Sequence, residues 1–186
     1  MGRIVFITGM SGSGKSTVGR LLARRFDKCL FVQVDEVREK VVSGYARPED
    51  GVFGEAAVEQ FRLARAAVTD MARLYAEAGF DVVIDDVCVP FDFGEHYADL
   101  FDAEDVHRVL LYPSASVVTE RIERRGGPLE HIEYVPMIYD FLESMPKDGW
   151  IVLDSSGWTA ERTVDSILSR IHSESSGARS DVGTAV

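Results

Sequence analysis

The segment Gly-Met-Ser-Gly-Ser-Gly-Lys-Ser at residues 9–16 constrains the fold of this chain more than any other part of the sequence. An apolar run precedes it, and an amphipathic pattern built on Val18, Leu21 and Leu22 follows it. Between a buried strand and a helix, glycines allow backbone conformations that side chains would block, so consecutive N–H groups can point inward. The positive end of the helix dipole adds to the same position. The segment therefore predicts an anion-binding turn between the first strand and the first helix.

The lysine and serine that end this turn make the prediction more specific. Lys15 can reach the β and γ phosphates of a nucleotide, and the Ser16 hydroxyl is placed to bind Mg²⁺. This arrangement is the Walker A motif, or P-loop, and it predicts ATP and Mg²⁺ as cofactors. A chance match to a glycine-rich turn is the alternative, and the flanking strand and helix argue against it. The residues expected to hold the nucleotide are Gly9, Met10, Ser11, Gly12, Ser13, Gly14, Lys15, Ser16 and Thr17.

Short apolar runs rich in branched side chains alternate with longer helical patterns, which is typical of a parallel sheet with crossover helices. We expect strands at residues 3–8, 30–34, 82–86, 107–112 and 150–154. We expect helices at residues 15–26, 36–43, 55–78, 93–101, 115–125, 132–144 and 159–172. The predicted fold class is α/β, with three α/β/α layers around a five-stranded parallel sheet.

The length of 186 residues and the 46% content of hydrophobic residues fit one domain with a single core. We expect this domain at residues 1–172 and a disordered tail without apolar periodicity at 173–186. Two segments rich in turn-forming and charged residues, 44–51 and 124–128, are candidate mobile flaps. The second is expected to begin a lid at about residues 124–135.

The formal net charge is −11, from 31 acidic and 20 basic residues, so the average surface repels polyanions. This charge argues against a nucleic-acid partner, although basic residues gathered around a cleft would still accommodate one. No apolar run approaches the ~20 residues of a membrane span. We therefore expect a soluble, cytoplasmic protein with no membrane partner.

A P-loop protein that transfers a phosphoryl group needs an acidic side chain that orients the acceptor hydroxyl and takes its proton. Asp35 ends the second apolar run, and in an open parallel sheet the site forms at the carboxyl ends of the strands. Asp35 is therefore the predicted catalytic base, while the cap of a helix starting at Glu36 is the alternative. Arg38, one helical turn further on, could bind an anionic or phosphate-bearing acceptor. A surface arginine paired with Glu36 or Glu39 is its alternative role.

Two carboxylates, Asp85 and Asp86, end the third apolar run. Strand side chains alternate, so one should point into the site and the other away. Such a residue can hold Mg²⁺ directly or through water, and it can also contact the substrate. We favour Asp85 as the metal ligand beside Ser16, and Asp86 is the second choice. The alternative is that the pair only initiates the following loop.

The predicted fifth helix ends in arginines that two glycines follow. Arg121 and Arg125 share one helical face, so a lid that closes over ATP would bring both to the transferring phosphoryl group and exclude water. The alternative is that these arginines only complement the helix dipole. Further along, the loop at 154–158 could pack against adenine, although Trp158 reads more readily as a core residue.

From the P-loop through Asp35, Asp85, the lid arginines and Asp154, the chain resembles the superfamily of small P-loop kinases, which contains shikimate, gluconate and nucleotide kinases. The resemblance implies a P-loop NTPase fold of the nucleotide-kinase-like type. Residues 79–87 and the placement of Val34 and Asp35 are similar to the corresponding parts of chloramphenicol phosphotransferases. By that resemblance, Asp35 would be the base that activates an antibiotic hydroxyl. The combination of Lys15 and Ser16 with Asp35, Arg38 and Asp85 also resembles the 5′-hydroxyl polynucleotide kinases, in which the matching arginine binds an acceptor phosphate.

Our interpretation is an ATP-dependent kinase that phosphorylates a hydroxyl of a small metabolite or antibiotic. A polynucleotide 5′-hydroxyl kinase is one alternative, although lysine occurs only at positions 15, 28, 40 and 147 and few side chains could track a phosphate backbone. A nucleotide-binding regulatory ATPase without a small acceptor is the other. The chain has no Asn-Lys-x-Asp segment that would read guanine.

Overall fold

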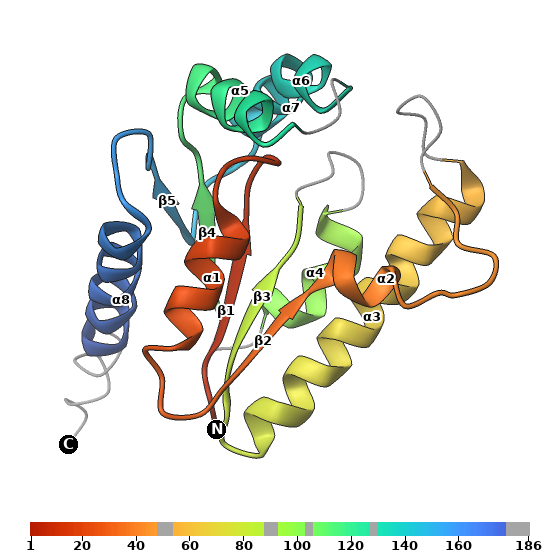
Figure 1. Ribbon diagram of the computed structural model, residues 1–186. Helices are drawn as coiled ribbons and strands as arrows, with labels where there is room; N and C mark the ends of the chain where they lie inside the picture. The colour runs from red at the N-terminus through yellow and green to blue at the C-terminus, as the bar shows by residue number, and fades with distance from the viewer. Residues whose placement is uncertain (48–53, 88–92, 103–105, 127–129, 178–186) are drawn as a thin grey trace, which may run out of the picture.

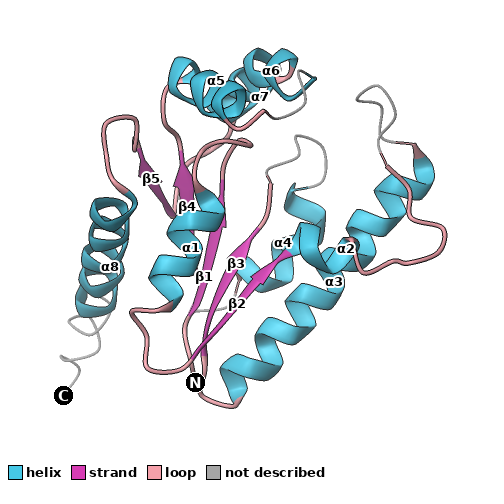
Figure 2. Ribbon diagram, viewed as in Figure 1, coloured by secondary structure: helices cyan, strands magenta, loops and turns pink. Residues whose placement is uncertain are grey.

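The structure is a computed structural model that describes residues 1–47, 54–87, 93–102, 106–126 and 130–177. Within these ranges, one parallel sheet has the strand order β2-β3-β1-β4-β5 (Figure 1). The strands are β1 (Ile4–Thr8), β2 (Cys29–Gln33), β3 (Asp81–Asp85), β4 (Val106–Leu111) and β5 (Trp150–Leu153). Helices cover both faces of this five-stranded sheet, so the predicted α/β/α fold class is confirmed (Figure 2).

The helices lie on the two faces of the sheet and beyond the carboxyl ends of its strands (Figure 1). They are α1 (Lys15–Ala23), α2 (Val34–Arg38), α3 (Glu55–Glu77), α4 (Phe93–Phe101), α5 (Ala115–Arg124), α6 (Glu130–Glu133), α7 (Val135–Ser144) and α8 (Ala160–Gly177). α1 and α8 pack on one face, and α3 and α4 pack on the other. α5, α6 and α7 lie together above the carboxyl ends of the strands.

The central strand β1 connects the two halves of the core. All of its residues are buried, because helices cover both faces. Ile4 and Phe6 belong to the apolar cluster under α3 and α4, and Val5 and Ile7 to the cluster under α1 and α8. This alternation fixes which residues face each layer.

The parallel register brings the carboxyl ends of β1, β2 and β3 to one edge of the sheet. Ile7 of β1 is paired with Asp85, and Gln33 of β2 is paired with the same residue on the other side. The P-loop follows β1 directly, and α2 follows β2. Polar residues at these strand ends are therefore neighbours in space, although they lie far apart in sequence.

Several helices differ from their expected bounds, and α1, for example, ends at Ala23 and not at residue 26. The helix expected at residues 36–43 begins at Val34 and ends at Arg38. The chain folds back after it, and the Arg38 guanidinium donates a hydrogen bond to the Ala46 carbonyl at 3.2 Å. The single helix expected at 132–144 is divided into α6 and α7, because a proline in the first turn of α7 favours a new helix start.

The last helix is longer than expected. α8 runs through Gly177, into the segment predicted as a tail, and the remaining residues 178–186 lie outside the described ranges. The first flap, predicted at 44–51, is described only up to residue 47. In the described part of the chain, no helix is both long and apolar enough to cross a membrane.

Candidate active site

The P-loop has the backbone geometry that its sequence predicts. Gly9, Gly12 and Gly14 have φ angles of 145°, 83° and 101°. A Cβ atom at Gly9 would lie 2.4 Å from the Leu111 carbonyl oxygen, so only glycine fits there. Gly14 precedes the first helical residue, Lys15, so the open N–H groups of α1 begin at the loop. The turn is therefore shaped to receive an anion.

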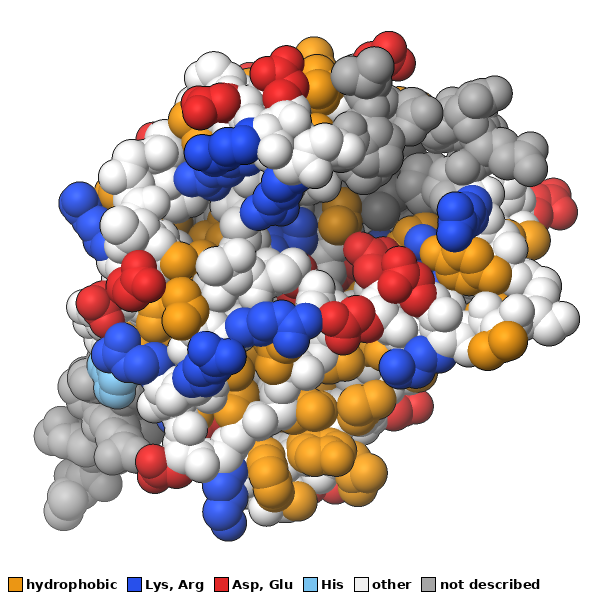
Figure 3. All heavy atoms as spheres, viewed as in Figure 1, with side chains coloured by type: hydrophobic (Ala, Val, Ile, Leu, Met, Phe, Trp, Pro, Cys, Tyr) orange, Lys and Arg blue, Asp and Glu red, His pale blue; other side chains and the backbone are white. Residues whose placement is uncertain are grey.

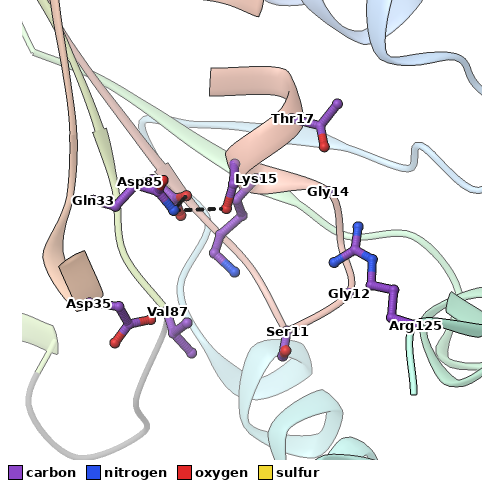
Figure 4. A pocket seen from close by; sticks show the side chains of 11 residues that line it. Ser11, Gly12, Gly14, Lys15, Thr17, Gln33, Asp35, Asp85, Val87 and Arg125 are labelled. Atoms are coloured by element: carbon purple, nitrogen blue, oxygen red, sulfur yellow. Dashed lines mark hydrogen bonds between the residues drawn. The ribbon is translucent and has the colours of Figure 1, made fainter. Parts of the chain in front are cut away.

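A cavity of about 360 Å³ opens at the carboxyl ends of the strands (Figure 4). Most of its lining residues were predicted from the sequence, and they come from the P-loop, β3, α2 and the end of the lid helix. The lining consists of Ser11, Gly12, Gly14, Lys15, Ser16, Thr17, Gln33, Asp35, Asp85, Val87 and Arg125. The structure thus brings the residues predicted to bind phosphate, the predicted base and Arg125 to a single cavity.

The buried lysine spans the inside of the P-loop. Lys15 is only 6% exposed, and its Nζ atom donates a hydrogen bond to the Met10 carbonyl at 3.2 Å. An ammonium group held this way can exchange the carbonyl for phosphate oxygens without moving out of the cavity.

Of the two neighbouring carboxylates, Asp85 lines the cavity. Burial raises the pKa of the Asp85 carboxyl, while the charge of Lys15 and a hydrogen bond with Ser16 work in the opposite direction. Gln33 donates a hydrogen bond from Nε2 to Asp85 Oδ2 at 3.1 Å. The carboxylate is thus desolvated but partly compensated by a cation and hydrogen-bond donors.

Asp86 belongs to a different part of the structure. Its Oδ2 atom accepts hydrogen bonds from Arg65 Nε and from the Tyr97 hydroxyl, both at 2.8 Å, and all three side chains are buried. Burial raises the pKa of Asp86, and the Arg65 guanidinium opposes that rise. Asp86 does not line the cavity and instead joins β3 to α3 and α4, so its predicted contact with substrate stays a prediction.

The oxygen ligands around Ser16 suit Mg²⁺. Ser16 Oγ and the Asp85 carboxylate lie beside the P-loop, and Mg²⁺ prefers such hard oxygen ligands together with phosphate oxygens and water. Among the described residues, no cluster of three His, Cys, Asp or Glu side chains could hold a metal. The residues present therefore fit an ion that binds together with a nucleotide, not an all-protein metal cage.

Asp35 lies in the first turn of α2 with a half-buried side chain. The residue that caps this helix is Gln33, and the helix starts before Asp35, so the alternative role of Asp35 as the cap is not seen. Within the described part of the chain, its carboxylate has no hydrogen bond or ion pair. The group is thus available to a molecule in the cavity.

Arg38, at the end of α2, is buried. Its guanidinium lies 4.1 Å from the centre of the Phe61 ring and 4.9 Å from that of Tyr45. Arg38 Nε is buried without a hydrogen-bond partner, and neither Glu36 nor Glu39 pairs with the side chain in the described structure. The alternative role as a surface ion pair is thus not seen. Arg38 does not line the cavity, and its contact with an acceptor stays a prediction.

The helix α5, which precedes the predicted lid, is attached to the P-loop. Arg121 Nη1 donates to the Ser13 carbonyl at 3.2 Å and lies near the Gly12 carbonyl at 3.4 Å. Met10 is buried in an apolar cluster with Val118 and Ile122 of α5. Arg125, at the exposed end of α5, reaches the cavity, while residues 127–129 of the predicted lid lie outside the described ranges.

A second cavity of about 190 Å³ adjoins the first, and the two share Gly14, Thr17 and Arg125. Arg121 and Arg124 line it from the lid, and Trp158 from the loop after β5. Trp158 also packs against the core cluster under α8, as its alternative role requires, while its contact with adenine stays a prediction. Planar ring and guanidinium groups can stack on a nucleotide base, which is what the untested prediction for the loop at 154–158 needs.

The comparisons with known proteins agree with this geometry. The model of a family described as AAA domain matches residues 4–138. The chain belongs to this AAA domain family. No curated protein matches the sequence.

Solved structures similar to this AAA domain include several kinases. An unliganded sugar kinase from Janibacter sp. HTCC2649 has a TM-score of 0.68 and 20% identity over 91% of this chain and 94% of its own. A shikimate kinase from Acinetobacter baumannii, solved with shikimate, has a TM-score of 0.66 and 20% identity over 93% and 94%. A gluconokinase from Sinorhizobium meliloti 1021 has a TM-score of 0.64 and 21% identity over 97% of both chains. The AAA domain thus has the fold of the small P-loop kinases, which confirms the resemblance.

Sequence reasoning missed Gln33 and Val87 in the cavity and the Arg65 and Tyr97 contacts of Asp86. Gln33 carried one available signal, because it is a polar residue at the carboxyl end of a predicted strand. Arg65 carried none, since its role depends on how α3 packs on the sheet.

Proposed function

We propose that this AAA domain is an ATP-dependent kinase that transfers the γ-phosphoryl group to a hydroxyl of a small molecule, either a metabolite or an antibiotic. The observation that carries the proposal is the position of Asp35. Its carboxylate lines the same cavity as Lys15 and has no partner in the described structure (Figure 4). A regulatory nucleotide-binding site would not need an unpaired acid beside the phosphates.

In the proposed reaction, the P-loop and Lys15 hold the triphosphate, and Asp35 orients the acceptor hydroxyl and accepts its proton. The acceptor oxygen forms a bond to the γ-phosphorus as the bond to the departing ADP oxygen breaks. Arg125 and Arg121 offset the charge of the transferring group from the lid at about residues 124–135. We place the catalytic unit at residues 1–172.

Mg²⁺ is the proposed metal cofactor, and Ser16 and Asp85 are the residues that would hold it. When bound, it offsets negative charge on the phosphate oxygens. Gln33 donates a hydrogen bond to each of these two side chains.

Two observations support a small acceptor over a nucleic acid. The net charge of −11 repels a polyanion, and acidic side chains line the α2 side of the hollow in Figure 3, opposite basic side chains near the lid. The similar structures named above are kinases of a sugar, shikimate and gluconate. Arg38 would add a cation for an anionic group of the acceptor.

The test is transfer from γ-labelled ATP with Mg²⁺ into a panel of sugars, sugar acids, nucleosides, hydroxylated antibiotics and a 5′-hydroxyl oligonucleotide. Label on a small molecule is the expected result, and it would identify the acceptor class. Label on the oligonucleotide alone would replace the proposal with polynucleotide kinase activity. Nucleotide binding without transfer to any acceptor would favour a regulatory ATPase.

A further inference from the structure

One side chain that motif reasoning does not identify joins the two residues proposed to hold the metal. Gln33 Nε2 donates hydrogen bonds to Ser16 Oγ and to Asp85 Oδ2, each at 3.1 Å. Gln33 is the last residue of β2 and is paired with Asp85 in the parallel register, so both side chains leave the sheet side by side. The amide thus connects α1, β2 and β3 at the floor of the cavity (Figure 4).

The orientation of this amide is fixed by Arg20. Arg20 Nη2 lies 2.5 Å from Gln33 Oε1, and a guanidinium can only donate hydrogen bonds. The carbonyl oxygen of the amide must therefore face Arg20, which turns the NH₂ group toward Ser16 and Asp85. Arg20 is itself held by an ion pair with Glu36 at 2.7 Å and by the Phe31 ring at 4.8 Å.

This orientation decides what the Ser16 hydroxyl can offer. A hydroxyl oxygen has two lone pairs and one hydrogen. One lone pair accepts the Gln33 bond, and the hydrogen can bond to Asp85, so the second lone pair stays available to a cation. A carboxylate at position 33 could not donate to either neighbour, and an apolar side chain would leave both unsupported.

We infer that Gln33, held by Arg20, is a positioning residue that orients Ser16 and Asp85 for the divalent cation bound with the nucleotide. The inference rests on the proposed function, because it assumes a metal–nucleotide complex in this cavity. It assigns Gln33 no contact with the reacting atoms. Replacing Gln33 should therefore reduce the gain in ATP affinity that Mg²⁺ provides. Replacing a merely structural residue would change ATP affinity equally with and without Mg²⁺.

The test measures the affinity of the full chain for ATP by isothermal titration calorimetry, once with Mg²⁺ and once with EDTA. Wild type is expected to bind ATP more tightly with Mg²⁺. In Gln33→Met, this gain is expected to fall about tenfold or more, the usual scale for residues that orient metal ligands, with the affinity in EDTA unchanged. Thermal unfolding checks that each variant is folded.

Two further variants separate the network from general surface effects. Arg20→Met removes an exposed side chain that the core does not need, and it should reduce the Mg²⁺-dependent gain in the same direction by a smaller factor. Arg25→Met is the matched control, because Arg25 forms a comparable exposed ion pair with Asp165 at 2.8 Å outside the cavity. This control should bind ATP as wild type does under both conditions.

The inference is overturned if Gln33→Met keeps the full Mg²⁺-dependent gain, or if it loses affinity equally with Mg²⁺ and EDTA. If wild type itself gains nothing from Mg²⁺, both this inference and the metal part of the proposed function fail. If wild type shows the gain but phosphorylates no acceptor, the kinase proposal fails, and the role of Gln33 is still decided by the binding data.

Discussion

The two sides of the cavity are built from different chemical groups. The P-loop side consists largely of backbone, with three glycines at positive φ and the buried ammonium of Lys15. The α2 side presents side chains, with Asp35 on the cavity and Arg38 buried between aromatic rings. Figure 3 shows the corresponding contrast at the hollow, where basic side chains lie on the α5 side and acidic side chains on the α2 side.

This difference suggests that one side of the cavity binds the nucleotide phosphates and the other side selects the acceptor. Every nucleoside triphosphate presents the same phosphate oxygens, so one backbone cradle serves them all. Acceptors differ in shape and charge, so the side that meets them depends on individual side chains. Changes on the P-loop side should thus affect every reaction of the protein, whereas changes on the α2 side should affect particular steps.

The largest effect is expected on the P-loop side. Lys15→Ala removes the ammonium that reaches the phosphates, so phosphoryl transfer should fall below detection while the fold is kept. Transfer from labelled ATP measures activity, and circular dichroism with thermal unfolding measures the fold. A fully active Lys15→Ala protein would refute the nucleotide site.

A smaller effect is expected where the two sides meet. Asp35→Asn keeps the shape of the side chain but cannot accept a proton, so turnover should fall roughly a hundredfold or more. ATP affinity should stay the same, because Asp35 faces the acceptor. Calorimetry and steady-state kinetics separate the two quantities, and unchanged turnover would leave Asp35 without a catalytic role.

For Asp86, which lies outside the cavity, the expected effect of substitution is on the stability of the fold. Asp86→Asn removes the carboxylate charge that compensates the buried Arg65 guanidinium, so the free energy of unfolding should fall by about 3–5 kcal/mol. Denaturant unfolding near neutral pH measures it. Asp85→Asn is the matched control, since burial raises the pKa of Asp85 and its ionised form is costly to bury. This control should be as stable as wild type or more stable, and equal losses in both variants would contradict the separate roles of the two residues.

The mildest effect is expected on the binding of the acceptor when Arg38 is replaced. Arg38→Met removes the buried cation but keeps much of the apolar volume between Phe61 and Tyr45. If Arg38 binds an anionic group, KM for the acceptor should rise about tenfold or more, which corresponds to one lost charged hydrogen bond. KM for ATP should not change. A rise in both constants would indicate a general disturbance of α2.

The local sequence pattern was sufficient to predict the sheet and the P-loop. The strands lie within one residue of their expected bounds, because short runs of branched apolar residues between turn residues are typical of buried parallel strands. The P-loop is a contiguous segment whose glycines, lysine and serine each have a local reason. Asp35, Asp85 and Arg125 could be predicted from their places at strand and helix ends.

The contacts that link distant segments could not be predicted from the local sequence pattern. Gln33 and Asp85 become neighbours only through the strand register, and Asp86 is turned to Arg65 by the packing of α3. The early start of α2 was missed because Val34 completes an apolar run and reads as strand. Residue propensities did not predict this helix start, because tertiary packing overrides them at such boundaries.

The burial of Met10 limits how the P-loop and the lid can evolve. The second residue of the nucleotide-binding motif lies in the same apolar cluster as Val118 and Ile122, and a Cβ atom at Gly12 would lie 3.1 Å from Ile122. We therefore expect the effects of substitutions at positions 10 and 122 on stability not to add. The P-loop and α5 therefore share one packing interface, and a change on either side of it also acts on the other.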